Sequence, residues 1–268
     1  MMRAIRAEFL KLKGSKVPLW TALATVAYGA IAIGGAFAIK NGANIGESLA
    51  KAGGAWAQAA ALGRYTPTWE NLLLQNVQGI AGAWGIFLFG FVTAYVFGRE
   101  RKEGTNATML TSPVQRRSFA VAKMVVIAAW VLALTLFSFV FQTVGIAPAG
   151  LSGFAWEHVF RSLGQMLEAA LIIYLTMPLV AFVALLGKPG YLKPMVFAAT
   201  LNAFGMGFAA DESARLVPWA MPILIGGASW MPITPAKIDG VSWAICVAVF
   251  VVGMAAVMWK LGRASDAV

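Results

Sequence analysis

Apolar runs long enough to cross a membrane recur along this chain of 268 residues, and they constrain its fold more than any other feature. A helix needs roughly 20 mostly apolar residues to span the hydrocarbon core of a bilayer. Hydrophobic residues make up 60% of the chain and charged residues only 12%, whereas charged residues are about a quarter of a soluble domain. We therefore predict an all-α membrane protein in which residues 1–268 form a single transmembrane domain. Its six transmembrane helices are expected at residues 17–39, 77–97, 123–143, 168–186, 195–210 and 241–259.

The segment before the first run is basic and periodic. Ile5, Phe9 and Leu12 recur at helical spacing, and most of the basic residues lie on the other side of the helix that this spacing implies. This pattern is typical of an amphipathic helix that lies in the membrane interface. We predict such an interface helix at residues 2–15. The alternative is a disordered basic tail that only orients the first span.

One apolar segment before the last run is too interrupted to be counted as a span. The stretch "PWAMPILIGGASWMP", residues 218–232, contains three prolines and a Gly-Gly pair. A lipid-facing helix there would lose backbone hydrogen bonds. We predict a short broken extracellular element, with Trp219 and Trp230 at the level of the headgroups. A seventh span is the alternative.

The distribution of basic residues favours six spans. With six spans, fifteen of the 21 lysines and arginines lie on the side that holds both termini. The positive-inside rule makes that side cytoplasmic. A seventh span would move Lys260 and Arg263 to the outside. We therefore predict a multi-pass protein of the plasma (inner) membrane with N- and C-termini in the cytoplasm. The net charge of +10 then indicates contact with anionic lipids rather than with nucleic acid.

The loop between the second and third runs, residues 98–122, is a compact polar segment. It contains the stretch "FGRERKEGTNATMLTSPVQRRS". Gly104 and Thr105 offer a break, and a short helix can follow until Ser112, because the residue before Pro113 is disfavoured in a helix. A short helix at the membrane face would present a docking surface to a soluble partner. A solvated, charged loop is the alternative from composition alone.

The residues of this loop resemble a motif of ABC-2-type transporter permeases, the membrane subunits of ABC exporters of the bacitracin, lantibiotic and multidrug kind. Their first intracellular loop commonly carries E-G-T, a short leucine-rich helix, and then S-P-V and a basic residue. The matching residues are Glu103, Gly104, Thr105, Leu110, Ser112, Pro113, Val114 and Arg116. The expected six spans, interface helix and broken extracellular element are also similar to that fold, which is the type V exporter fold.

The resemblance implies a division of labour between chains. The loop would be a coupling loop with a coupling helix that docks into a separate ABC-type ATPase, of which two copies are expected. A second permease chain would complete the pathway as a homodimer or as a close paralogue. The implied partner-binding residues are Glu100, Glu103, Gly104, Thr105, Met109, Leu110, Ser112, Pro113 and Arg116.

The implied function is that of the membrane-spanning permease subunit of an ATP-driven exporter. Its substrate would be hydrophobic or amphipathic: a peptide antibiotic, a drug or a lipid. The alternative is an ion-coupled secondary carrier or channel, although no internal repeat typical of such carriers is evident.

The sequence offers little chemistry of its own. It lacks the G-x-x-x-x-G-K-[ST] pattern, and Gly187-Lys188 is followed by proline, so ATP and Mg²⁺ are expected on the partner subunit rather than on this chain. Cys246 and His158 are the sole cysteine and the sole histidine, which excludes a cysteine-based metal site. We expect no bound cofactor, no metal and no catalytic residue in this chain.

Glu168 is the one acid within a predicted span. An ionisable group there is costly and usually faces a cavity or a partner, so one interpretation places Glu168 in the transport pathway. The other interpretation is an acid near the outer end of its helix, paired with Arg161 or reached by water.

Overall fold

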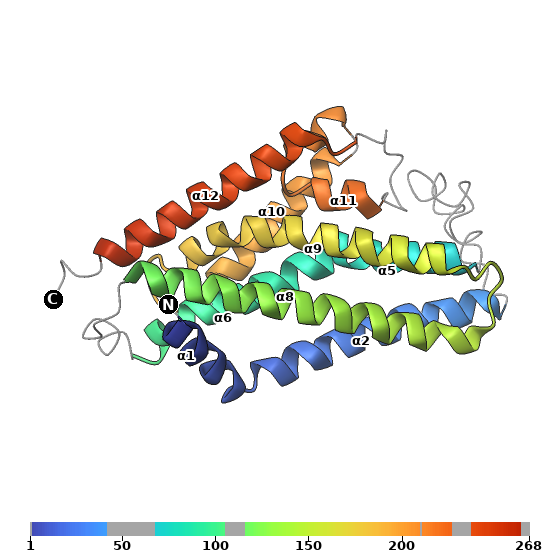
Figure 1. Ribbon diagram of the computed structural model, residues 1–268, viewed down its shortest axis with the longest axis horizontal. Coiled ribbons are helices and arrows are strands. Elements are labelled where there is room, and N and C mark those ends of the chain that lie inside the picture. The colour runs from blue at the N-terminus through green and yellow to red at the C-terminus, as the bar shows by residue number, and fades with distance from the viewer. Residues whose placement is uncertain (1, 42–67, 105–115, 210, 227–236, 264–268) are drawn as a thin grey trace.

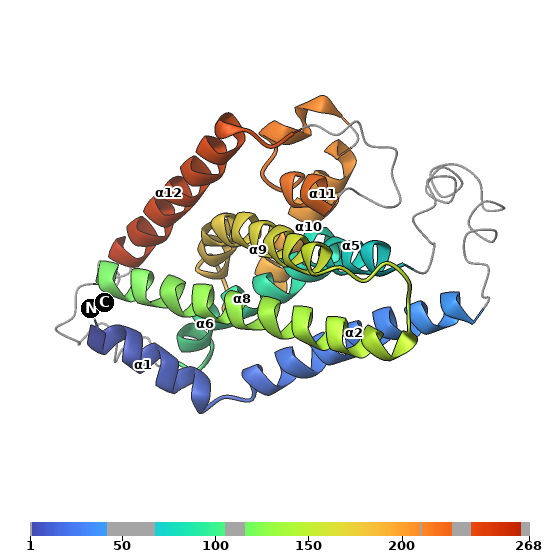
Figure 2. The same ribbon diagram turned by 45° about the vertical axis from the view of Figure 1, so that its right-hand side comes forward.

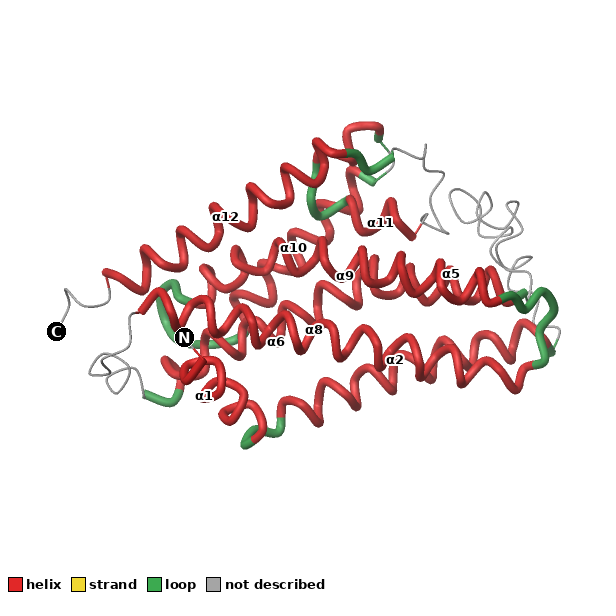
Figure 3. The backbone as a smooth tube through the Cα atoms, viewed as in Figure 1, coloured by secondary structure: helices red, strands yellow, loops and turns green. Residues whose placement is uncertain are grey.

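The computed structural model describes residues 2–41, 68–104, 116–209, 211–226 and 237–263, and over these ranges the chain is a bundle of helices (Figures 1 and 3). The α-helices are α1 (Met2–Lys13), α2 (Val17–Lys40), α5 (Trp69–Gly79), α6 (Gly85–Lys102), α8 (Arg116–Ile146), α9 (Trp156–Ala184), α10 (Leu192–Phe208), α11 (Met221–Gly226) and α12 (Gly240–Arg263). Shorter helical turns span Ile80–Trp84, Ala147–Ala149 and Glu212–Leu216. An isolated bridge joins Thr68 to Ser152.

Four of these helices are long and apolar enough to cross a membrane, namely α2, α8, α9 and α12. The pair α5 and α6 passes the same test together but is bent by 40°, so it counts as a fifth span if it crosses once. Helix α10 lies on the predicted fifth span and has 17 residues, slightly fewer than the roughly 20 that a full crossing needs. The all-helical membrane architecture is confirmed, and the count of six stays a prediction.

The bend between α5 and α6 has a local cause in the backbone. Residues Ile80–Trp84 form a π-helical turn, and Gly82 within it has non-helical angles, with φ −81° and ψ −126°. Turns of this kind are a known source of sharp kinks. The helix also begins earlier than the predicted residue 77, because Thr68 caps α5 by accepting a hydrogen bond from the backbone N–H of Asn71.

Helix α9 is the centre of the bundle. It packs against α5, α6, α8, α10, α11 and α12, and its Met166, Ile173 and Met177 are fully buried. Helix α12 approaches α9 closely, since a Cβ built on Gly253 would lie 2.8 Å from Cβ of Pro178. Small residues permit such close contacts between membrane helices.

The two ends of the bundle are different in content. One end holds α1, the last turn of α6, the first turn of α8 and the last turn of α12 (Figures 1 and 2). The other end holds the last turn of α2, the last turn of α8 and the first turns of α5 and α9. Helix α1 and the last turn of α12 thus lie at the same end of the bundle, and the predicted even number of crossings stays a prediction.

The segment after α10 folds back onto the bundle. Helix α11 contacts α9 and α5, and its six residues extend only about 9 Å, far less than a span. Trp219 is half-buried, with its ring 6.4 Å from that of Phe204, and its place at the headgroups stays a prediction. Trp230 and the rest of residues 227–232 lie outside the described part of the chain.

Candidate functional site: the stem of the loop between α6 and α8

The predicted coupling loop leaves the bundle from α6 and returns into α8. Gly104 has a φ of +71°, the left-handed conformation that commonly follows the last turn of a helix. The E-G-T sequence thus ends α6 through its glycine. Five predicted partner-binding residues, Thr105, Met109, Leu110, Ser112 and Pro113, lie outside the described residues. Arg116 is the first residue of α8.

We call the last turn of α6 and the first turn of α8, which border this loop, the stem of the loop. Glu103 directly follows α6 and has an exposed carboxylate. Nε of Arg99 donates to both carboxylate oxygens of Glu103, at 3.0 and 3.1 Å, and the side chain of Glu103 keeps 47% of its accessible surface. Nη1 of Arg99 also donates to the backbone carbonyl of Lys11 at 2.7 Å. Arg99 therefore orients Glu103 and ties the stem to α1 at the same time.

Glu100 points in the opposite direction, into the protein. It is 6% exposed, and its Oε1 accepts hydrogen bonds from Nζ of Lys123 at 2.7 Å and from Nζ of Lys11 at 2.9 Å. Lys123 also donates to Oε2 of Glu8 at 3.1 Å, and Lys11 to Oε1 of Glu8 at 2.6 Å. We call these four residues, Glu8, Lys11, Glu100 and Lys123, the ion cluster.

The ion cluster is electrically balanced and mostly buried. Glu8 and Lys123 are 4% and 3% exposed, and Lys123 gains a further bond from its Nζ to the carbonyl of Val96 at 2.8 Å. Burial alone would lower the pKa of Lys11, but its hydrogen bonds to Glu8 and Glu100 and their negative charges raise that pKa above its ordinary value. Removing one partner from such a cluster typically costs about 3–5 kcal/mol, because an uncompensated charge stays buried.

Three members of the ion cluster, Glu8, Lys11 and Lys123, were not predicted as site residues from the sequence. Glu8 is the one acid of α1, and Lys123 stands at the start of an apolar run. The available signal was the spacing of Ala4, Glu8 and Leu12, four residues apart, which places them on one face of a helix. These three are the buried residues of α1. A carboxylate at the centre of a buried face requires a buried cation nearby.

The stem is also fixed to the turn between α9 and α10. Arg101 donates from Nη1 to the carbonyl of Ala184 at 3.3 Å and from Nη2 to that of Gly187 at 2.5 Å. Nζ of Lys102 lies 4.5 Å from the centre of the Tyr191 ring, within the range of a cation–π contact. The last turn of α6 is therefore held by α1 and α8 on one side and by the α9–α10 turn on the other.

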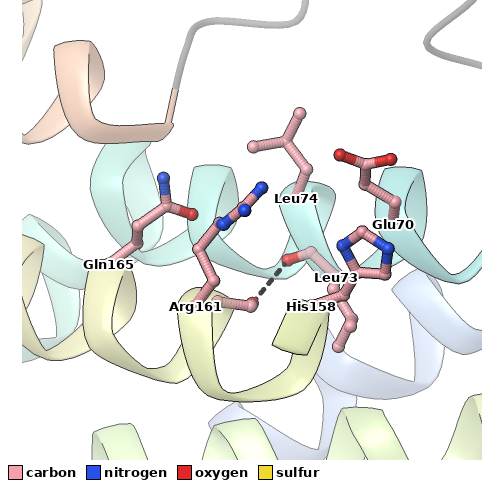
Figure 4. Close-up of a pocket in the computed structure, with 7 residues that line it drawn as sticks. Glu70, Leu73, Leu74, His158, Arg161 and Gln165 are labelled. Carbon is pink, nitrogen blue, oxygen red and sulfur yellow. Dashed lines mark hydrogen bonds between the residues drawn. The ribbon is translucent and has the colours of Figure 1, made fainter. Parts of the chain in front are cut away.

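A separate cavity lies at the opposite end of the bundle, between α5 and α9 (Figure 4). Its volume is about 130 Å³, and its lining residues are Glu70, Leu73, Leu74, His158, Arg161, Ser162 and Gln165. Oγ of Ser162 donates to the carbonyl of Leu73 at 3.0 Å and closes the floor. The cavity belongs to the end of the molecule away from the loop stem.

Glu168 is not among the residues that line this cavity. It is half-buried on α9. We expected Arg161 as one of its two candidate partners, but Nη2 of Arg161 donates to Glu157 at 2.6 Å instead, because Glu157 lies one helical turn away. A pathway role for Glu168 stays a prediction.

The sequence comparisons agree with the architecture around the stem. Residues 4–205 match the family described as ABC-2 family transporter protein. The chain belongs to the ABC-2 transporter family. The matched range includes all four residues of the ion cluster and both sides of the stem. It ends within α10, before the short helices that precede α12.

A known relative with a transport role in its name supports this family assignment. The chain is 32% identical over 173 residues to the bacitracin transport permease protein BCRB of Bacillus licheniformis, an alignment that covers 64% of this chain and 81% of that protein. No solved structure matches. The predicted family is confirmed, and the chain is the membrane subunit of an ABC transporter.

Proposed function

We propose that this chain is the permease subunit of an ATP-driven exporter, and that the loop between α6 and α8 docks into a separate ABC-type ATPase. The observation that carries the proposal is the construction of the stem. The last turn of α6 is clamped by α1, α8 and the α9–α10 turn, so a force on the loop would reach several helices at once. A solvated loop without a partner has no need of such a clamp.

The residues of the loop then divide into two roles. Glu103, exposed at the mouth of the stem, would meet a complementary charge on the ATPase together with Arg116. Met109 and Leu110 would fill an apolar hollow, and Ser112 and Pro113 would end the coupling helix and set its angle. Glu100 faces inward and would hold the stem instead of touching the ATPase.

The assembly would contain two ATPase subunits and a second permease chain in the plasma membrane, with ATP and Mg²⁺ bound on the ATPases. Export of an amphipathic peptide antibiotic is the favoured direction and substrate class, because the relative is named for bacitracin transport. An apolar, aromatic-rich bundle would also suit a hydrophobic drug or a lipid.

The test is a charge substitution in the loop. We expect Met109→Asp with Leu110→Asp to abolish co-purification of the ABC-type ATPase that the wild-type chain retains. Burial of a large apolar side chain contributes roughly 1.5–3 kcal/mol, so loss of two should weaken binding by about a hundredfold or more. The matched control is Asn106→Asp with Thr108→Asp, which adds the same charge to the same loop and keeps both apolar side chains.

The amounts of protein in the membrane should be equal for both double variants, because the loop lies outside the bilayer. Equal ATPase recovery from the two variants would contradict the docking role. The ion-coupled alternative is tested in inverted vesicles with bacitracin as the probe. Uptake that requires a proton gradient, and proceeds without ATP, would favour a secondary carrier over the proposed exporter.

A further inference from the structure

Helix α1 is attached to the loop stem by charge rather than by apolar packing alone. Its buried face has Ala4 and Leu12 at the two ends and Glu8 in the middle. At that middle point the carboxylate of Glu8 meets Lys123 of α8 at 3.1 Å, and Lys11 meets Glu100 of α6 at 2.9 Å. The ion cluster therefore joins three helices that are far apart in the sequence.

This kind of attachment resists separation. If α1 moved away from the stem, the Glu8–Lys123 and Lys11–Glu100 pairs would have to part in a site where Glu8, Glu100 and Lys123 are largely shielded from water. Charges that are parted inside a protein lose their attraction without regaining full hydration. A displacement of the stem should thus carry α1 with it instead of sliding past it.

Helix α1 continues almost directly into α2. The turn between them is short, from Gly14 to Lys16, and Oγ of Ser15 donates to the carbonyl of Leu12 at 2.8 Å, which keeps the turn tight. Helix α2 packs mainly along α8 and is the least buried of the four candidate spans. Helix α2 is therefore the candidate span that the bundle restrains least, and its N-terminal end is connected to α1.

We propose that the ion cluster is the joint through which the loop stem moves α1, and with it α2, during the transport cycle. Glu8 and Lys123 are then positioning residues of transport, although neither lies on the loop. The inference rests on the proposed function, because it requires an ATPase that acts on the loop. It adds a route from the loop to α2 that is independent of the contact between α2 and α8.

Two charge-balanced variants test the joint without leaving an unpaired buried charge. Glu8→Gln with Lys123→Gln keeps the Lys11–Glu100 pair, and Lys11→Gln with Glu100→Gln keeps the Glu8–Lys123 pair. The control is Glu157→Gln with Arg161→Gln, which removes an exposed ion pair at the other end of the bundle. Each variant also carries Cys246→Ala and a single cysteine at the exposed position Ala7, labelled with an environment-sensitive fluorophore.

The measurement is the change of fluorescence when the complex with its ATPase, in lipid nanodiscs, is trapped with ATP and vanadate. We expect the wild type and the control to show a change at position 7. In the two cluster variants this fluorescence change should be smaller by roughly fivefold or more, because fivefold is the lower end of typical coupling between distant sites. Their emission before trapping should match the wild type, because apolar contacts of Ala4 and Leu12 still seat α1.

The outcomes separate the joint from the docking itself. A wild type that retains its ATPase but shows no change at position 7, or cluster variants that show the full change, would overturn the joint and leave the docking intact. Failure of the wild type to retain an ATPase would remove the proposed function instead. If both double variants misfold, Glu8→Asp supplies the decision, because it keeps the charge, shortens the reach and should give a reduced change.

Discussion

The packing of the α11 segment onto α10 can be tested with a pair of neighbouring glycines. A Cβ built on Gly205 would lie 2.3 Å from the backbone oxygen of Trp219 and 3.0 Å from the backbone nitrogen of Ala220. A Cβ built on Gly207, in the same helix, would meet nothing within 4 Å. Only the first substitution to alanine should therefore force α10 and the turn before α11 apart.

The magnitude follows from two opposing effects. Replacing a glycine inside a helix by alanine favours folding by about 0.5–1 kcal/mol, and this gain applies to both variants. Overpacking a tight contact costs about 1–3 kcal/mol, and here the obstacle is backbone, which cannot rotate away. The turn is held by hydrogen bonds from the N–H groups of Ala220 and Met221 to the carbonyl of Val217. The difference between the two variants should thus equal the overpacking cost.

The assay measures the midpoint of thermal unfolding in detergent. Size-exclusion chromatography of a fluorescent fusion detects the protein that remains folded after heating. At roughly 2–4 °C per kcal/mol for chains near this length, Gly205→Ala should melt about 2–12 °C below Gly207→Ala. Gly207→Ala should match or exceed the wild type. Equal midpoints for the two variants would refute the contact, and with it the conclusion that the segment after α10 returns to the bundle.

Two smaller predictions concern single hydrogen bonds. Ser162→Ala should lower the thermal midpoint by the equivalent of about 0.5–1.5 kcal/mol, because buried Oγ of Ser162 donates to the carbonyl of Leu73, whereas Ser152→Ala at an exposed position should not. Asp239 caps α12 by accepting from the N–H of Ser242 at 2.9 Å, and this bond lowers the pKa of its carboxyl. The contribution of Asp239 to folding stability is therefore complete above the ordinary carboxyl pKa of about 3.9 and is lost as the pH falls through the lower pKa of the folded state. Asp239→Ala should thus flatten the acid side of a profile of melting temperature against pH. An unchanged profile would contradict the cap.

The helices were the predictable part of this structure, because apolar length is a property of a local sequence window. All the predicted spans fall on helices, and the E-G-T and S-P-V residues indicated the family that the comparisons confirm. The start of α5 was missed for a physical reason. Residues 69–78 mix apolar side chains with amides, such as Asn71, Gln75 and Asn76, so their mean hydropathy is low although Leu73 and Val77 are buried.

The ion cluster was beyond prediction from local patterns. Glu8 and Lys123 are 115 positions apart, and nothing in either neighbourhood specifies the other. The resemblance implied partner binding for both Glu100 and Glu103, yet the helical turn of α6 directs Glu100 inward while Glu103 stays outward. Sequence position gives the charge of a residue, whereas the direction of its side chain depends on the phase of the helix and on the helices packed around it.

The orientation of the bundle in the membrane yields a last prediction. The end that holds α1, the stem and the α9–α10 turn carries most of the basic residues, and the positive-inside rule predicts that this end faces the cytoplasm. Ser152, before α9, and Lys188, in the α9–α10 turn, are both exposed and lie at opposite ends of α9. In a background with Cys246→Ala, an impermeant thiol reagent on intact cells should label Ser152→Cys and should label Lys188→Cys only after permeabilisation. The reverse labelling pattern would mean the opposite orientation in the membrane, with the proposed docking loop outside the cell, where no ATP is available. Labelling of both positions from outside would mean that α9 does not cross the membrane.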